Sequence, residues 1–166
     1  MHYKVAAFYK FVHLDDFRKM RSSLLEACQG LDLVGTILLA EEGINGTIAG
    51  SPESITKIFD HFKEDKRMQN LQVKYSGAKE KPFHRIRVSL KKEIISMGVA
   101  GVDPSKRTGQ HVSAEEWNQL IADPEVVVLD TRNTYETAIG TFENAVDPQT
   151  ESFSNIVEYV DKNLAH

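Results

Sequence analysis

The feature that most constrains the fold is an alternation of two hydrophobic periods along the first 75 residues. Segments rich in β-branched and aromatic residues, typical of strands, occupy 3–12, 34–40, 47–49 and 71–75. Between the first and second of these, and between the third and fourth, apolar residues recur every three or four positions, as in an amphipathic helix. The order βαββαβ matches the ferredoxin-like arrangement, with two helices on one face of an antiparallel sheet. We therefore expect an α+β domain.

Both expected helices carry start and stop signals. Asp15 or Asp16 can cap the first helix, which is expected to end at Gly30. The second has Ser51 at its N-cap and Pro52 at its first helical position. The apolar faces are formed by Phe17, Met20, Leu24 and Cys28, and by Ile55, Ile58, Phe59 and Phe62. We interpret all eight, the single cysteine included, as core residues.

Residues 34–50 are expected to form a β-hairpin, with its turn at Glu41-Glu42-Gly43 or at Asn45-Gly46. Adjacent strand residues point to opposite faces, so Glu41 and Glu42 are not expected to act as a proton-transferring pair. We interpret Gly43 and Asn45-Gly46 as choices of backbone geometry. The alternative is a contact of this segment with a nucleic acid or with another domain.

The segment that follows predicts one more strand and then a linker. Residues 85–90 alternate charged or polar with apolar side chains, which is typical of a half-exposed strand, and 93–97 can continue it. Residues 98–112 contain three glycines and one proline, as a linker does. The expected organisation is a first domain over 1–97, a linker over 98–112 and a second region over 113–166.

The second region begins with a short helix and continues into a strand. Ser113 and Glu116 form a capping box, and Asp123-Pro124 is expected to end the helix. Four consecutive apolar residues at 126–129 predict a strand buried on both faces of a parallel sheet. One more helix is expected over 152–163, with no second run of this kind. We therefore expect an unfinished α/β sheet that is poorly ordered or rearranged, with an apolar edge that can pair with a second copy.

The net charge of −4 is unevenly distributed. Residues 1–112 hold 18 Lys/Arg and 13 Asp/Glu, a net +5, whereas residues 113–166 hold 2 and 11, a net −9. Ten basic and three acidic side chains fall within 63–92, and such a segment attracts a polyanion. The RNA-binding candidates are Lys74, Arg85, Arg87, Lys91 and Lys92, with Tyr75, Phe83 and His84 as aromatic groups for stacking. The alternative is that the lysines are only solvated and that Tyr75 and Phe83 face the core.

Several other classes of protein have no support in the sequence. No stretch approaches 18 consecutive apolar residues, the N-terminus lacks a secretory signal, and one cysteine allows no internal disulfide. We therefore expect a cytoplasmic protein without a membrane partner. The six histidines have no metal-ligand spacing, no nucleotide-binding glycine motif occurs, and no cofactor is identifiable. The loop at 11–14 lacks the glycines and arginine with which an acylphosphatase would cradle a phosphate.

Two long blocks of sequence carry a resemblance to a known family. The first is L-L-A-E-E-G-I-N-G-T-I at 38–48, and the second is V-L-D-T-R-N-T-Y-E at 128–136, followed by I-G-T-F at 139–142 and by Ala145. A third, looser block spans 83–98. In this order and at this separation the blocks resemble the bacterial tRNA wobble-uridine hydroxylase family of rhodanese-domain proteins (the TrhO or YceA group). The resemblance covers essentially the whole chain.

The resemblance implies that residues 113–166 are the truncated start of a rhodanese-like domain. It also implies that the full-length protein is an oxidoreductase that uses molecular oxygen to form 5-hydroxyuridine at the wobble position, in the anticodon region of certain tRNAs. The family's reactive cysteine lies in a C-T-G-G-I-R-C-like run that matches no position of this chain, so the resemblance places it beyond His166. No catalytic residue is therefore assigned within these 166 residues, and this chain alone is expected to be inactive. No flavin, haem or metal motif indicates how oxygen would be activated.

The residues that stand out in the two blocks are Glu42, Asn45, Asp130 and Arg132, which we interpret as a structural motif. Asp130 and Arg132 follow the expected strand at 126–129, where polar side chains can line a site. We favour an ion pair that shapes the loop, because a buried Arg132 needs a carboxylate partner.

Two other functions stay open at this point. One is a non-catalytic RNA-binding module with a rhodanese-like scaffold, and the other is a sulfurtransferase, since rhodanese domains commonly pass sulfur through a cysteine persulfide. Nucleoside analysis of tRNA from a deletion strain distinguishes the two enzymes. Loss of an oxygen-containing uridine would indicate the hydroxylase, and loss of a sulfur-containing uridine would indicate the sulfurtransferase. If the protein binds RNA, as the hydroxylase or as a non-catalytic module, changing Lys91 and Lys92 to Glu is predicted to weaken tRNA binding.

Overall fold

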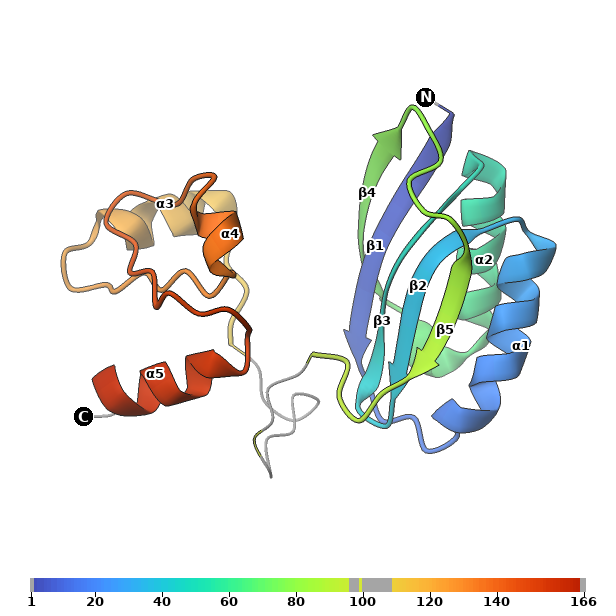
Figure 1. Ribbon diagram of the computed structural model, residues 1–166, viewed down its shortest axis with the longest axis horizontal. Helices are drawn as coiled ribbons and strands as arrows, with labels where there is room; N and C mark the ends of the chain where they lie inside the picture. Colours follow the sequence, from blue (N-terminus) through green and yellow to red (C-terminus); the bar gives the residue numbers. More distant parts are fainter. Residues whose placement is uncertain (1, 96–98, 100–108, 165–166) are drawn as a thin grey trace. The chain divides into compact units, whose positions relative to one another are not determined.

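The computed structural model describes residues 2–95, 99 and 109–164, and the chain divides into two compact units within this part (Figure 1). Unit 1 lies within residues 2–95 and unit 2 within residues 109–164. The elements of unit 1 are β1 (Tyr3–Phe11), α1 (Phe17–Gly30), β2 (Val34–Ala40), β3 (Gly43–Gly50), α2 (Pro52–Glu64), the 3₁₀ turn η1 (Lys66–Met68), β4 (Gln72–Ala78) and β5 (Ile86–Leu90).

The strands of unit 1 form one sheet in the order β4-β1-β3-β2-β5. The first four pair antiparallel, in the order that the ferredoxin-like arrangement requires, and β5 adds to the edge of β2 in parallel. Both helices lie on the same side of the sheet (Figure 1). The expected βαββαβ order and α+β class are confirmed.

The core of unit 1 fills the space between the helices and one face of the sheet. Phe8 of β1 lies in it, with its ring centroid 5.5 Å from those of Phe59 and Phe62 on α2. Cys28 of α1 is fully buried in the same cluster, as the helical spacing predicts. Aromatic pairs at this separation contribute roughly 0.5–1.5 kcal/mol beyond the burial of their surface.

The hairpin turns at Glu41-Glu42, the first of the two expected positions, and the alternative of a turn at Asn45-Gly46 is wrong. Asn45 and Gly46 lie within β3, because Gly46 serves a close approach instead of a turn: a Cβ there would lie 2.8 Å from Cζ of Phe8. Gly43 has a φ of +146°, and a Cβ on it would lie 2.0 Å from the carbonyl oxygen of Lys10. These glycines let β3 lie tightly against β1.

Unit 2 contains three helices, α3 (Ala114–Ala122), α4 (Thr134–Thr137) and α5 (Asn155–Asn163). The capping box of Ser113 and Glu116 forms as expected, and α3 ends before Asp123. The expected buried strand at 126–129 is wrong for this structure: the only pairing there, within the described residues, is a parallel bridge from Leu129 to Val146. None of the four residues is buried, and Val127 is 62% exposed. A strand buried in a parallel sheet has other strands on both sides, and the described part of unit 2 contains this one bridge and no strand.

The expected linker at 98–112 and the expected extension of the strand at 93–97 lie partly outside the described residues. Within 91–95 the chain leaves the sheet after a single further hydrogen bond, in which the backbone nitrogen of Lys91 donates to the carbonyl of Leu39 at 2.8 Å. The expected C-terminal boundary of the second region, at His166, also lies outside the described residues. The domain bounds and the rhodanese-like character of residues 113–166 stay predictions.

Candidate nucleic-acid interface

The sheet of unit 1 has a helix face, covered by α1 and α2, and an open face on the other side. Strand residues alternate between the two faces, so Ala6 and Phe8 of β1 point to the helices while Ala7 and Tyr9 point away. The strand register brings five open-face residues into one line across the sheet. This central row consists of Lys74, Ala7, Thr47, Thr36 and Arg87, on β4, β1, β3, β2 and β5 respectively.

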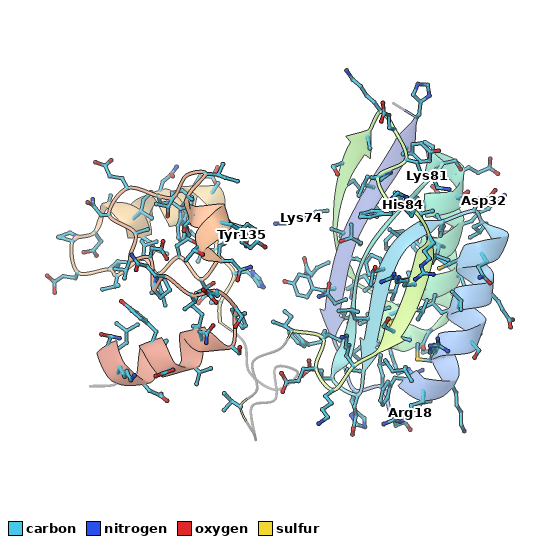
Figure 2. All side chains as sticks on the ribbon, in the orientation of Figure 1. Arg18, Asp32, Lys74, Lys81, His84 and Tyr135 are labelled. Carbon is cyan, nitrogen blue, oxygen red and sulfur yellow. The ribbon has the colours of Figure 1, made fainter. Side chains whose placement is uncertain are left out.

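The central row is basic at both ends and small and uncharged in between. Lys74 and Arg87 are exposed and have no ion pair within the part of the chain that the structure describes. Figure 2 shows Lys74 projecting from β4 on the side of the sheet away from both helices. Two of the five RNA-binding candidates, 13 residues apart in the sequence, thus lie at the two ends of one line.

The next row of the open face carries an aromatic side chain. It consists of Gln72, Tyr9, Asn45, Leu38 and Ser89. Two positions along β1 from Tyr9 and on the same face, Phe11 places its ring centroid 6.2 Å from that of Tyr9. Both rings are half-buried. From the sequence, Tyr9 and Phe11 are identified only as strand residues. The alternation of side chains along β1 is the signal that could have placed them on the face opposite to Ala6 and Phe8.

The other three RNA-binding candidates lie at the two ends of β5. Arg85 precedes the strand, in the connection from β4 that also carries Lys81 and His84 (Figure 2). Lys91 and Lys92 follow the strand at its other end, and both are exposed. The structure therefore does not gather the five candidates into one cluster, but lines them along β5 and the central row.

Part of the basic run at 63–92 is neutralised by neighbouring carboxylates. Arg67 donates to Asp65 at 2.7 Å and to Asp16 at 2.6 Å, and these hydrogen bonds lower the pKa of both carboxyl groups. Asp16 is the N-cap residue of α1 but accepts no capping hydrogen bond, because its carboxylate is directed to Arg67. Arg67 therefore stabilises unit 1 internally and is a poor candidate for binding phosphate.

The aromatic candidate Tyr75 lies on the helix face. Its ring meets that of Phe59 edge-on at 6.0 Å, and Nζ of Lys4 lies 4.1 Å above it. Although 53% exposed, Tyr75 therefore belongs to the edge of the core, which supports the alternative interpretation for this residue. Phe83 is half-buried and His84 is exposed.

Glu42 and Asn45 together hold the backbone of one buried residue, Ile94. Oε1 of Glu42 accepts a hydrogen bond from the nitrogen of Ile94 at 2.5 Å, and Nδ2 of Asn45 donates to the carbonyl of Ile94 at 3.1 Å. Ile94 is 52 residues beyond Glu42, so the first block of the motif fixes where the chain leaves the sheet. These two hydrogen bonds to Ile94 are consistent with a structural role for Glu42 and Asn45.

Asp130 and Arg132 pair with each other in unit 2. The Asp130 carboxylate accepts from Nη2 of Arg132 at 2.5 Å and from the hydroxyl of Thr141 at 2.7 Å, while the same Nη2 donates to the carbonyl of Gly140 at 2.7 Å. The hydrogen bond from Arg132, and then that from Thr141, lower the pKa of Asp130. These contacts connect residues 130–132 to residues 140–141.

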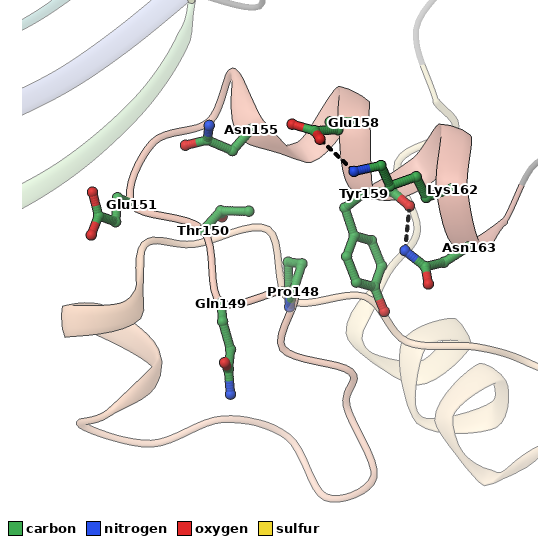
Figure 3. A pocket seen from close by; sticks show the side chains of 9 residues that line it. All are labelled: Pro148, Gln149, Thr150, Glu151, Asn155, Glu158, Tyr159, Lys162 and Asn163. Carbon is green, nitrogen blue, oxygen red and sulfur yellow. Dashed lines mark hydrogen bonds and ion pairs between the residues drawn. The ribbon is translucent and has the colours of Figure 1, made fainter.

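Two open cavities lie in unit 2. One, of about 460 Å³, is lined by Trp117, Leu129, the Asp130–Arg132 pair and Phe142. The other, of about 430 Å³, lies beside α5, and Figure 3 shows Tyr159 reaching from that helix toward Pro148. The two charged side chains of this cavity, Glu158 and Lys162, form an ion pair with each other.

The single cysteine offers no reactive thiolate. Burial raises the pKa of the Cys28 thiol to about 12, so the group is a neutral apolar side chain near pH 7. The reactive cysteine that the resemblance implies has no counterpart in the sequence up to His166, and His166 itself lies outside the described residues. Its position beyond His166 therefore stays a prediction.

Two further kinds of site are absent from the part of the chain that the structure describes. Among these residues, no group of three His, Cys, Asp or Glu side chains could hold a metal ion. Over the same ranges, no helix is long and apolar enough to cross a membrane.

The order and pairing of the strands define a ferredoxin-like α+β domain with a fifth, parallel edge strand. Residues 3–94 match the family described as the UPF0176 acylphosphatase like domain, and the chain belongs to this family. Among solved structures, the dark-state structure of BlrB, a BLUF protein, has a TM-score of 0.46 and 17% identity, over 58% of this chain and 79% of that one. This likeness is too weak to indicate a function.

Two curated relatives match nearly the whole chain. A protein of Acaryochloris marina named tRNA uridine(34) hydroxylase is 52% identical over 93% of this chain and 50% of its own length. A protein of the same name from Teredinibacter turnerae is 49% identical over 98% of this chain and 50% of its own length. The chain thus spans about half the length of the curated relatives that it matches. The match includes unit 2, which the family description does not reach.

Proposed function

We propose that this chain is the N-terminal half of an oxygen-dependent tRNA hydroxylase that forms 5-hydroxyuridine at the wobble position. The observation that carries the proposal is the identity of 52% and 49% to two relatives named tRNA uridine(34) hydroxylase, extending through both units. The substrate would be the anticodon region of tRNA, and the protein would act in the cytoplasm, where tRNA is modified.

Within that enzyme, the residues of this chain contribute binding and scaffolding. Cys28 is buried, with its pKa raised to about 12, so it is not the nucleophile of a rhodanese-type reaction. By the family resemblance, we propose that a cysteine of the full-length protein outside this chain carries the chemistry, with molecular oxygen as the co-substrate. Unit 2 would form the first part of the rhodanese-like domain, in which the Asp130–Arg132 pair shapes a loop.

The proposal is tested by deleting the gene and analysing the nucleosides of total tRNA by mass spectrometry. Loss of 5-hydroxyuridine and its derivatives, with thiolated uridines unchanged, is the expected result. Loss of a thiolated uridine instead would identify a sulfurtransferase, and an unchanged nucleoside profile would leave only an RNA-binding module. Growth without oxygen is expected to reproduce the loss in the parent strain, since the hydroxyl oxygen would come from O₂.

The binding role is tested on the chain itself with a tRNA transcript. The double variant Lys91→Glu with Lys92→Glu removes two exposed cations after β5 and is expected to weaken binding at low salt. The control is Glu93→Gln, which changes the next position without introducing negative charge. Unchanged affinity of the double variant would place the tRNA elsewhere on the chain.

A further inference from the structure

We propose that the open face of the unit 1 sheet binds a single-stranded segment of RNA. The phosphates lie at Lys74 and Arg87, the two ends of the central row, and unpaired bases stack on Tyr9 and Phe11. The identity of the ligand as RNA rests on the proposed function. The location of the site rests on the side chains of the open face.

The first argument is the charge on the two sides of the sheet. The open-face positions of the five strands include no Asp or Glu, and their two charged residues, Lys74 and Arg87, are both basic. On the helix side, by contrast, exposed cations of α2 are paired with carboxylates one turn away, as in Lys57 with Glu53 at 2.7 Å and Lys63 with Asp60 at 2.8 Å. A polyanion is therefore attracted to the open face more strongly than to α2.

The second argument is the shape of the row between the two cations. Four inter-strand spacings separate Lys74 from Arg87, a span of about 19 Å. The residues between them are Ala7, Thr47 and Thr36, which are small enough to let a ligand lie close to the backbone of the sheet. The threonine hydroxyl groups can both donate and accept hydrogen bonds at base edges.

The third argument selects a single strand over a duplex. Tyr9, in the row next to the central row, and Phe11, one row further along β1, are both half-buried on the same face. An aromatic ring on a sheet stacks on a base only if that base is unpaired. Stacking and phosphate contacts on adjoining rows then fit one strand of RNA crossing the sheet.

The charge argument is tested with two double variants of equal charge change. Lys74→Gln with Arg87→Gln removes both cations of the central row, and Lys19→Gln with Lys57→Gln removes two exposed cations from α1 and α2. Binding of the 166-residue chain to an RNA stem-loop is measured by fluorescence anisotropy across a salt series. The probe has an unpaired loop of about seven nucleotides, chosen to match an anticodon loop.

We expect the open-face pair to weaken binding at least about tenfold and to reduce the slope of log K against log salt by about 1.4, near 0.7 for each lost contact to a single strand. The helix-side pair is expected to change affinity less than about twofold. Equal losses in the two pairs, or none in the open-face pair, would overturn the proposal.

The stacking argument is tested with one substitution on each face of the sheet. Tyr9→Thr removes the open-face ring and Tyr75→Thr removes the helix-side ring, while threonine keeps a high β-propensity in both strands. Tyr9→Thr is expected to weaken binding at least about fivefold, the lower end of the effect of losing one stacked base, and Tyr75→Thr to leave it unchanged. The reverse ranking would overturn the proposal, and circular dichroism confirms that each variant is folded. Should Tyr9→Thr not fold, Phe11→Leu provides the same comparison.

The same titrations separate failure of the site from failure of the function. If the unmodified chain binds the stem-loop and the open-face variants bind equally well, the proposed site is wrong and the tRNA function stands. If the unmodified chain binds neither the stem-loop nor tRNA at low salt, the tRNA-binding role itself fails. An Ala7→Cys variant whose added thiol, at an exposed position of the open face, does not react with a thiol reagent in the absence of RNA would show that a second copy or another segment covers the face, and would also overturn the proposal.

Discussion

Unit 1 and unit 2 are built from the same kinds of element but differ in how far they bury their apolar residues. In unit 1, seventeen buried residues form one cluster between the sheet and two helices. In unit 2, the one buried hydrophobic residue within 109–164 is Ile156. Several of its large apolar side chains stay in solvent, including Ile139 at 89% exposed and Phe142 at 52%. The difference lies in the sheet: unit 1 completes one, and the described part of unit 2 does not.

This comparison shows what an apolar sequence pattern requires of its surroundings. Residues 126–129 are as hydrophobic as those of β2, yet only β2 is buried, because β2 has β3 on one side and β5 on the other. A strand pattern therefore predicts burial only together with its neighbours. Exposed apolar surface of this kind is typical of surfaces that interact with a partner or a ligand.

The largest expected effect of a single substitution is in the core of unit 1. Phe8→Ala removes a ring in contact with Phe59 and Phe62 and is expected to cost about 3–5 kcal/mol of unfolding free energy. Phe142→Ala, in unit 2, is expected to cost less than about 1 kcal/mol because the side chain is half exposed. Urea unfolding by circular dichroism reports mainly on unit 1, and fluorescence of the only tryptophan, Trp117, reports on unit 2.

The second effect concerns the backbone of the β3 hairpin. Gly43→Ala places a Cβ 2.0 Å from the Lys10 carbonyl at a φ of +146°, and is expected to cost at least about 2 kcal/mol. Gly140 in unit 2 has a similar φ of +156°, but no atom lies within 4 Å of its Cβ position, so Gly140→Ala suffers only the backbone strain. Equal losses of stability in the two variants, measured by urea unfolding, would contradict the role of close β1–β3 packing.

The elements of unit 1 could be predicted because their signals are local. The bounds of α1 and β2 and the start of α2 follow from apolar spacing and from Ser51 and Pro52, and the structure confirms them. Of the two turn positions that the sequence left open, the one at Glu41-Glu42 is confirmed, whereas Asn45-Gly46 lies within β3, where Gly46 packs closely against Phe8. Local patterns do not distinguish these two uses of glycine.

The candidate site was predicted by residue type but not by arrangement. Basic residues at 74 and 87 were recognisable in the sequence, whereas their place at two ends of one row depends on the strand order and register. The contact of Glu42 and Asn45 with Ile94 was equally out of reach, since it joins positions about 50 residues apart. Pairing across the sheet is a property of the fold and has no local signature.

A third, smaller effect is expected where the chain leaves the sheet. Glu42→Ala leaves the buried backbone nitrogen of Ile94 without its acceptor and is expected to cost about 1–3 kcal/mol. Its neighbour provides the matched control: Glu41→Ala removes an exposed carboxylate and is expected to change stability by less than about 0.5 kcal/mol. Hydrogen exchange of the Ile94 amide should accelerate in the first variant only. Unchanged exchange would show that the hydrogen bond from Ile94 does not hold this segment.

The smallest expected effect is a pH dependence confined to unit 2. Hydrogen bonds from Arg132 and Thr141 hold the pKa of Asp130 below its ordinary value of about 3.9, so the folded loop favours the ionised carboxylate. A depressed pKa in the folded state contributes stability that is complete above about pH 4 and is lost as the pH falls toward the folded-state pKa. Arg132→Gln removes the largest of these hydrogen bonds, so the pKa of Asp130 is expected to rise toward its ordinary value.

Carboxyl NMR titration of Asp130 measures this shift directly, with Thr141→Val as a graded comparison that removes only the second hydrogen bond. The acid-induced change in Trp117 fluorescence should begin at a higher pH in Arg132→Gln than in the unmodified chain, because Trp117 lines the same cavity as the pair. Glu53 of unit 1, whose pKa is lowered by Lys57, is the internal reference that should not move. A pKa of Asp130 that is the same with and without Arg132 would mean that the pair does not form in solution, and that the loop of unit 2 is held by other contacts.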